Sequence, residues 1–258
     1  MEERLYDAAY QGKVEEVEEI LRDYPNINVN WVNEEENGQP FALQQACSVG
    51  HDSVVSLLLA HPDIDVNQKD RGGHTAFIYA SAYGRSSCVR LLLKDSRVLV
   101  NERNEDGYTP LNWATFFGRL DVIKWWIASG REMDLGTPGN DYTDSIGTAK
   151  KVGETEAATL LERFKENPEE TRYSVRMELG CSDEMAAEVF ALVVFVSDGL
   201  LEIKDTTTIM SRFFSIARQL PLELQMVLCF RVFGSVKEII HGVESEEAFK
   251  ELATKPWL

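Results

Sequence analysis

Apolar side chains recur at the spacing of an amphipathic helix in short segments, and these segments come in pairs separated by a glycine. Near the middle of the chain, Leu111 and Ala114 share one face of a first segment that ends at Gly118. A second segment follows at residues 122–127 and is rich in large apolar side chains. This pattern predicts a helix, a tight turn and a second helix, with the two apolar faces packed together.

The same pair of segments occurs at nearly constant spacing along the first two-thirds of the chain. An alanine followed four residues later by a glycine marks the end of each first segment. These pairs are Ala8/Gly12, Ala46/Gly50, Ala80/Gly84, Ala114/Gly118 and Ala149/Gly153. The glycines are 38, 34, 34 and 35 residues apart. Such a period indicates a structural repeat, in which each unit needs its neighbours to bury its apolar face.

Turn and cap residues precede the first helix in the best-preserved unit. Asp106-Gly107 is typical of a tight turn with a positive φ at the glycine. Thr109 is expected to cap the helix, and Pro110 to be its first residue, where a missing N–H costs nothing. Three of the second segments lead into a Val-Asn pair, at residues 29–30, 66–67 and 100–101.

Together these features resemble the ankyrin repeat, through Gly-x-Thr-Pro-Leu at residues 107–111 and Gly-x-Thr-Ala-Phe at residues 73–77. The resemblance implies an all-α ankyrin-repeat solenoid of helix-turn-helix units with β-turn fingers. We expect five units over residues 1–167, the first (residues 2–31) and fifth (residues 137–167) being degenerate caps. The histidine common in the first helix of such repeats is replaced by Gln44, Ile78 and Asn112. Asn112 retains the capacity for a local hydrogen bond, whereas Ile78 does not.

The resemblance implies that a partner binds the concave surface built by the fingers and the first helices. The candidate partner-binding residues are Ser48, Val49, Arg71, His74, Ala82, Tyr83, Glu105, Asp106, Tyr108, Phe116 and Phe117. Four of them are rigid aromatic residues, which supply most hot spots of interfaces. The alternative is that these four pack against the C-terminal segment or a neighbouring helix. Trp113, Trp125 and Trp126 occupy apolar positions of the repeat and are expected in the core.

The repeat pattern ends at Asn167-Pro168, and residues 168–258 are predicted to form a small helical bundle of their own. A helix apolar nearly all round, and therefore buried, is expected from Ser182 to about Ser197. Residues 220–253 begin Leu-Pro-Leu-Glu-Leu and faintly resemble an F-box, which binds a Skp-type adaptor of cullin ubiquitin ligases. This resemblance would imply a ubiquitin-ligase substrate adaptor. The same residues also fit a helix opened by proline with an acidic first turn.

The chain is acidic, with 43 Asp and Glu residues against 26 Lys and Arg and a formal net charge of −17 at pH 7. This balance disfavours nucleic acid and anionic membranes as partners, because both bind basic patches. It suits a partner protein with a basic or apolar surface, or serves solubility alone. The longest apolar run is eight residues, there is no signal-peptide segment, and the four cysteines lack ligand spacing. We therefore expect a monomer in the cytoplasm or the nucleus.

No residue pattern points to catalysis, a metal site or a cofactor. The four histidines, His51, His61, His74 and His241, lack the partner spacing of a metal site or of a nucleophile and its base. No glycine-rich phosphate-binding loop is present. His51 directly follows a helix-closing glycine and is expected to make a structural hydrogen bond. The sequence predicts a non-catalytic interaction module or scaffold, the remaining alternative being an enzyme with an unrecognised site in residues 168–258.

Overall fold

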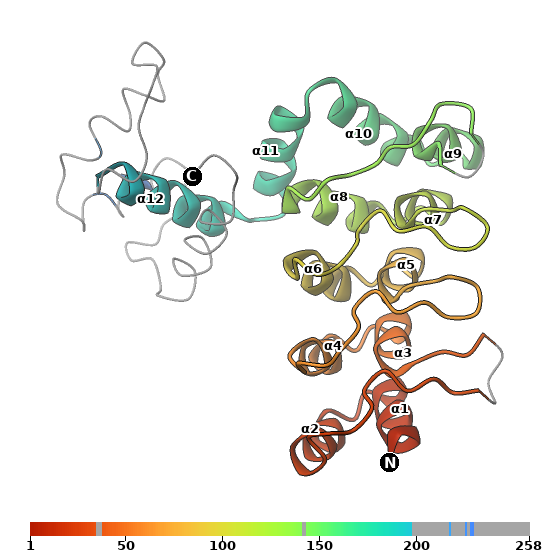
Figure 1. Cartoon of the computed structure of the whole chain (residues 1–258). Helices are drawn as coiled ribbons and strands as arrows, with labels where there is room; N and C mark the ends of the chain where they lie inside the picture. The colour runs from red at the N-terminus through yellow and green to blue at the C-terminus, as the bar shows by residue number, and fades with distance from the viewer. Residues whose placement is uncertain (35–37, 141–142, 198–216, 218–224, 226–227, 230–258) are drawn as a thin grey trace. The chain divides into compact units, whose positions relative to one another are not determined.

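The computed structural model describes residues 1–34, 38–140, 143–197, 217, 225 and 228–229, and the regular elements of this part are helices (Figure 1). An isolated antiparallel bridge joins Val32 to Phe41. The chain divides into two compact units, Met1–Val175 and Arg176–Leu258. None of the helices in the described part combines the length and the apolar character that a membrane crossing requires.

The first unit is a stack of helix pairs. The pairs are α1 (Glu2–Gln11) with α2 (Val14–Asp23), α3 (Ala42–Val49) with α4 (Asp52–Leu59), α5 (Ala76–Ala82) with α6 (Ser86–Lys94), α7 (Pro110–Phe116) with α8 (Leu120–Ser129), and α9 (Ser145–Val152) with α10 (Thr155–Glu166). In Figure 1 the first helices form one column and the second helices another. Each first helix packs on the next, from α1 to α9. The predicted all-α solenoid of helix-turn-helix units is confirmed.

Local signals in the sequence set the ends of these helices. Thr109 caps α7, because its hydroxyl oxygen accepts a hydrogen bond from the Asn112 N–H at 3.1 Å. Pro110 is the first residue of that helix. At the end of α3, Gly50 adopts a φ of 100°, and its N–H donates to the Ala46 carbonyl at 2.9 Å. A side chain is rarely tolerated at such a φ, which explains the glycine that closes the first helix of each unit.

The residue after the closing glycine ties its unit to the preceding one. The contacts are His51 Nε2 with the Tyr10 carbonyl (3.1 Å), Arg85 Nε with the Ser48 carbonyl (2.9 Å) and Arg119 Nε with the Ala82 carbonyl (2.9 Å). Each bond satisfies a carbonyl in the last turn of a first helix, where no intrahelical donor is available. The structural hydrogen bond predicted for His51 is confirmed.

A second series of links comes from the Val-Asn pairs. Their valines, Val29, Val66 and Val100, are buried. The asparagine side chains donate to carbonyls of the next unit, from Asn30 to Asp63 (2.7 Å), from Asn67 to Arg97 (2.8 Å) and from Asn101 to Glu132 (3.4 Å). The same side chains accept from the backbone N–H groups of Asp65, Leu99 and Asp134. The recurring dipeptide therefore marks a recurring contact between units.

The tryptophans of the repeats divide between the core and the surface. Trp126 is fully buried, with its ring centroid 5.0 Å from that of Phe77. Trp113 and Trp125 are only partly buried, so the prediction that all three lie in the core is wrong for these two. The Arg90 guanidinium covers Trp125 at 4.5 Å from the ring centroid. Both rings lie at the edge of an apolar helix face, where helical spacing alone does not separate core from surface.

The helix α11 (Pro168–Glu178) follows the repeats and contains the division between the two compact units. The Arg172 Nε donates to the Ile127 carbonyl at 3.2 Å, which ties the first turns of α11 to α8. The next helix, α12 (Ser182–Ser197), has the bounds expected from the sequence, and its buried residues include Ala186, Phe190, Ala191 and Val193. The domain boundary after residue 167 and the helical bundle stay predictions, since nearly all of residues 198–258 lie outside the described part.

Candidate protein-binding face

In the described part of the chain, three fingers project beside the column of first helices, namely residues 31–34 with 38–41, residues 69–75 and residues 103–109 (Figure 1). We call the surface formed by these fingers and by the exposed sides of α1, α3, α5, α7 and α9 the finger face. Each finger is closed by a backbone hydrogen bond, from Asn33 to Pro40 (3.0 Å), from Asp70 to His74 (3.1 Å) and from Asn104 to Tyr108 (3.1 Å). Neighbouring fingers are joined by the Arg71 N–H to the Gly38 carbonyl (2.8 Å) and the Glu105 N–H to the Gly72 carbonyl (3.0 Å). The fingers therefore form one continuous row.

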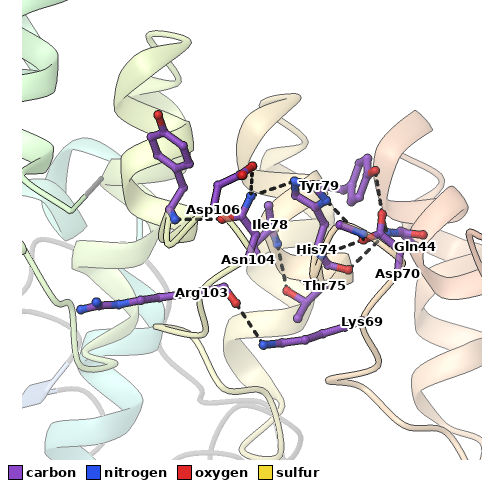
Figure 2. Close-up of polar contacts among 12 residues, drawn as sticks. Gln44, Lys69, Asp70, His74, Thr75, Ile78, Tyr79, Arg103, Asn104 and Asp106 are labelled. Carbon is purple, nitrogen blue, oxygen red and sulfur yellow. Dashed lines mark hydrogen bonds and ion pairs between the residues drawn. The ribbon is translucent and has the colours of Figure 1, made fainter. Parts of the chain in front are cut away.

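Asp70 is the centre of a polar network that holds the second finger in place (Figure 2). Its Oδ1 accepts hydrogen bonds from the backbone N–H groups of Gly72 at 2.9 Å and His74 at 2.8 Å. Its Oδ2 accepts from Gln44 Nε2 and from the Tyr79 hydroxyl, each at 3.0 Å. Gln44 belongs to α3 and Tyr79 to α5, so one buried carboxylate joins two consecutive units to the finger between them.

The surrounding donors keep this carboxylate ionised. Burial raises the pKa of Asp70, but hydrogen bonds from the side chain and backbone of His74 and from Gln44 outweigh burial and leave the pKa below its ordinary value. Burial, followed by the negative charge of Asp70, raises the pKa of Tyr79. At neutral pH the network is therefore a carboxylate anion with a neutral phenol as one of its donors.

His74 continues the network to the third finger. Its Nδ1 lies 3.2 Å from Asp70 Oδ1, and its Nε2 lies 3.1 Å from the Asn104 Nδ2 (Figure 2). An amide nitrogen is always a donor, so Nε2 accepts and Nδ1 carries the proton given to Asp70. Asn104 in turn accepts from the Tyr108 N–H at 2.8 Å. Both ring nitrogens of His74 thus help to hold the second and third fingers in position. Its predicted contact with a partner stays a prediction.

The residues that replace the family histidine act in three different ways. Gln44 bonds to Asp70 as described, and the aliphatic side chain of Ile78 is buried. Asn112 donates from Nδ2 to the Thr148 Oγ1 at 3.0 Å, so its side chain bonds to the following unit rather than locally. Gln44 and Asn112 therefore bond to the following unit through different partners, whereas Ile78 adds a buried apolar side chain.

An aromatic cluster occupies the middle of the finger face. Its members are Tyr79, Tyr83, Tyr108, Trp113, Phe116 and Phe117. Trp113 and Phe117 stack with ring centroids 5.7 Å apart and an interplanar angle of 14°, and Tyr79 and Tyr83 stack at 5.9 Å and 27°. His74 lies between the two pairs, 5.4 Å from Tyr79 and 6.1 Å from Trp113. The fingers and the first helices of the third and fourth units thus share one set of ring contacts.

The cluster remains open to solvent in spite of these contacts. Tyr83 is 51% exposed, Phe116 50% and Phe117 44%. Among the ring–ring contacts of the described part, Phe116 and Phe117 pair with each other and with Trp113. The Trp113 Nε1 is buried without a hydrogen-bond acceptor among the described residues, which costs about 1–3 kcal/mol for such a donor. This surface is therefore apolar and exposed, and it includes one N–H donor, that of Trp113, without a described acceptor.

The sequence-based choice of site residues missed part of this face. The missed residues are Tyr10, Tyr79, Trp113 and Val152. Counted from the alanine of each unit, Tyr10 has the position of Phe116, and Val152 has the position of Phe117. Tyr10 is 53% exposed and Val152 41%. Aligning the units on that alanine would have found both residues from the sequence.

The remaining predicted site residues also lie on the fingers or at the ends of the first helices. Arg71, Glu105 and Asp106 are exposed on the fingers, whereas Ser48, Val49 and Ala82 are partly buried near the ends of α3 and α5. The Ser48 hydroxyl donates to the Gln45 carbonyl at 2.9 Å. Partner contact by the predicted residues stays a prediction, although the structure brings them onto one surface.

The alternatives that involve catalysis or a ubiquitin ligase receive no support from the described residues. Within these residues, no three His, Cys, Asp or Glu side chains are placed to hold a metal ion. A hollow of about 230 Å³ between the turns after α5 and α7 is lined by residues that include Gly84, Ser86, Gly118 and Arg119. The F-box-like segment, residues 220–253, lies outside the described part except for residues 225, 228 and 229. Most of the C-terminal segment proposed to hold an unrecognised enzyme site lies outside it as well.

Comparison with known proteins identifies the repeats. A family profile described as ankyrin repeats matches in three copies, over residues 5–104 and 73–136. The matches extend from α1 into the loop after α8 and include all of the aromatic cluster. No curated protein matches the chain significantly.

Proposed function

Because the chain belongs to the ankyrin-repeat family, we propose that it is a non-catalytic module that binds a partner protein through its finger face. Ankyrin repeats are generally protein–protein interaction modules. The aromatic cluster carries the proposal, since Tyr83, Phe116 and Phe117 each keep about half of their surface exposed. Large exposed aromatic groups mark interaction sites, and aromatic residues are enriched among the side chains that dominate binding energy.

The order of the finger face supports this function. Asp70 fixes the second finger to two helices, and His74 fixes it to the third finger. The rings of Trp113 and Phe117 are stacked, with centroids 5.7 Å apart. A surface already held in its binding geometry loses little conformational entropy when a partner docks. Binding energy gained by burying the rings is therefore not consumed by ordering the site.

The charge of the chain narrows the class of partner. A formal net charge of −17 supports a protein partner rather than nucleic acid or an anionic membrane. We propose a monomeric module in the cytoplasm or the nucleus. In support, the four cysteines, Cys47, Cys88, Cys181 and Cys229, are free and buried, as is usual in a reducing compartment.

A cross-linked pull-down from cell extract tests the proposal. The full chain is compared with Phe116→Glu/Phe117→Glu, which places two charges on the aromatic cluster. The matched control is Tyr24→Glu/Tyr173→Glu, because these tyrosines are 47% and 49% exposed but belong to the end of α2 and to α11. Circular dichroism first confirms that both variants keep their helix content.

We expect specific partners to be lost with the Phe116/Phe117 variant and retained with the control. Loss of at least tenfold in captured partner corresponds to about 1.4 kcal/mol, well within what one hot-spot aromatic contributes. Partners captured equally by the wild type and by the Phe116/Phe117 variant would overturn the finger face as the binding surface. Partners lost only with the control would place binding on the second helices or on α11.

A further inference from the structure

The side chains on the finger face change from one end of the stack to the other, from aromatic to acidic. This change indicates which kind of partner the face fits. The aromatic cluster lies on α5, α7 and their fingers. Counted from the alanine of each unit, Asp7 of α1 has the position that Tyr79 and Trp113 have in α5 and α7. Glu3 lies one helical turn before Asp7, on the same side of α1. At this helix position the third and fourth units therefore carry aromatic rings, and the first unit carries a carboxylate.

These two carboxylates are exposed and uncompensated. Neither Glu3 nor Asp7 makes an ion pair or a side-chain hydrogen bond within the described part of the chain. The cations nearest in sequence, Arg4 and Lys13, both pair with Glu16, at 2.7 Å and 3.5 Å. Over residues 1–23, eight Asp and Glu side chains stand against three Lys and Arg side chains, so the first helix pair has a negative net charge.

Around the aromatic cluster, by contrast, positive and negative side chains are mixed. Arg119 holds its guanidinium carbon 5.8 Å from the Phe117 ring centroid. Arg71 is exposed on the second finger, which is bonded to the third finger that carries the exposed Glu105 and Asp106. Opposite charges on adjoining fingers offset each other's field. A cationic segment is therefore favoured at α1 more than at the cluster.

Between these two regions lies a low-charge stretch on α3. Gln45, Ser48 and Val49 are partly buried there. The Gln45 side chain donates to the Tyr6 hydroxyl at 2.7 Å, and the Ser48 hydroxyl donates to the Gln45 carbonyl. These groups are bonded within the chain, so the stretch separates the aromatic cluster from the acidic end without adding a charge of its own.

We propose that the finger face binds an extended protein segment that places an apolar anchor on the aromatic cluster and a Lys- or Arg-rich stretch against Glu3 and Asp7. This inference rests on the proposed function and adds the chemistry of the partner and the spacing of its two parts. Packed helices are about 8–10 Å apart, and the cluster lies two to three helices from α1. An extended chain covers about 3.3 Å per residue, so the basic stretch lies about five to nine residues from the anchor.

Selection from a random 16-residue peptide library displayed on phage tests this inference with the full chain. We expect selected peptides to carry aromatic or aliphatic residues and, about five to nine residues away, two or more Lys or Arg. Selected peptides without this basic stretch, or with it directly beside the anchor, would overturn the inference. Failure to select any binding peptide would equally overturn an extended segment as the occupant.

Matched variants then measure the acidic end with one selected, fluorescently labelled peptide. Glu3→Gln/Asp7→Asn is expected to raise the Kd about three- to tenfold at low salt and to flatten its dependence on salt, as for exposed charge pairs. Glu15→Gln/Glu18→Gln changes the same charge on exposed positions of α2 and is expected to leave the Kd unchanged.

The two proposals fail in distinguishable ways. Binding lost with Phe116→Glu/Phe117→Glu but indifferent to Glu3→Gln/Asp7→Asn would overturn the bipartite segment and leave the proposed function standing. Binding indifferent to Phe116→Glu/Phe117→Glu would overturn the proposed function and this inference together.

Discussion

At the scale of single residues, the side chain of Asp70 carries a hydrogen-bond network that joins two units. Its carboxylate receives hydrogen bonds from Gly72, His74, Gln44 and Tyr79, and those partners come from two helices and one finger. Hydrogen bonds to a charged acceptor are stronger than those between neutral groups, and buried donors that lose their acceptor are costly. The finger geometry therefore depends strongly on the charge of one side chain.

Asp70→Asn is predicted to reduce the free energy of unfolding by about 2 kcal/mol at pH 7, because an amide nitrogen replaces one of the acceptor oxygens. The pKa of Asp70 is lowered in the folded state, so its stabilisation is complete above the unfolded pKa of about 3.9 and is lost as the pH falls through the folded value. The difference between wild type and variant should therefore shrink below about pH 4. Urea unfolding at pH 7, 5 and 3 measures it.

Asp7→Asn is the control for this substitution, because Asp7 is exposed and makes no side-chain hydrogen bond or ion pair in the described part. It is expected to change the free energy of unfolding by less than about 0.5 kcal/mol at any of these pH values. An equal loss in both variants, or a loss in Asp70→Asn that is independent of pH, would show that the ionised carboxylate does not hold the finger.

At the scale of elements, α7 shows how a short first helix depends on its cap and on its neighbours. The helix α7 has seven residues, too few to be stable alone in water. Thr109 satisfies one free N–H at its start, and Arg119 bonds the Ala82 carbonyl at the end of α5. Stability at this scale comes from caps and from neighbouring units rather than from helix propensity.

Thr109→Ala is predicted to lower the free energy of unfolding by about 1 kcal/mol, because the Asn112 N–H loses its acceptor. Thr109→Ser keeps the hydroxyl and should retain most of that energy. Urea denaturation followed by circular dichroism measures both variants. Thr159→Ala is the control, since the Thr159 hydroxyl only donates back to the Thr155 carbonyl on an exposed helix surface. Equal effects of the alanine and serine variants at Thr109 would contradict the capping role.

The elements also show what the sequence is able to predict. The caps and closing glycines follow from residues close together in sequence, and each was predictable. The Val-Asn pairs were visible in the sequence, but their hydrogen bonds to the next unit join residues 30 to 33 positions apart and were not predicted. The polar network around Asp70 was not predictable, because Gln44 lies 26 residues before Asp70 and no local pattern links the two. The partial exposure of Trp113 was also missed, because an aromatic residue at the edge of an apolar stripe fits both core and surface. The exposure of Tyr10 follows from aligning the units, a comparison between repeats rather than within one.

At the scale of the first compact unit, the finger face joins these features into one surface. Bonded fingers give it order, aromatic rings of the third and fourth units give it an apolar centre, and carboxylates of the first unit give it an acidic end. We propose that a partner protein docks on this aromatic centre. Docking brings the partner into contact with these rings, and a reagent that reports contact tests it most directly.

Site-specific photo-cross-linking in cell extract is that measurement. Benzoylphenylalanine replaces Phe117 in one preparation and Tyr24 in another, two aromatic positions of similar exposure, 44% and 47%. We predict a discrete protein adduct from position 117, competed by unlabelled wild-type chain, and none from position 24. Competed adducts from position 24 but not from position 117 would contradict binding through the finger face.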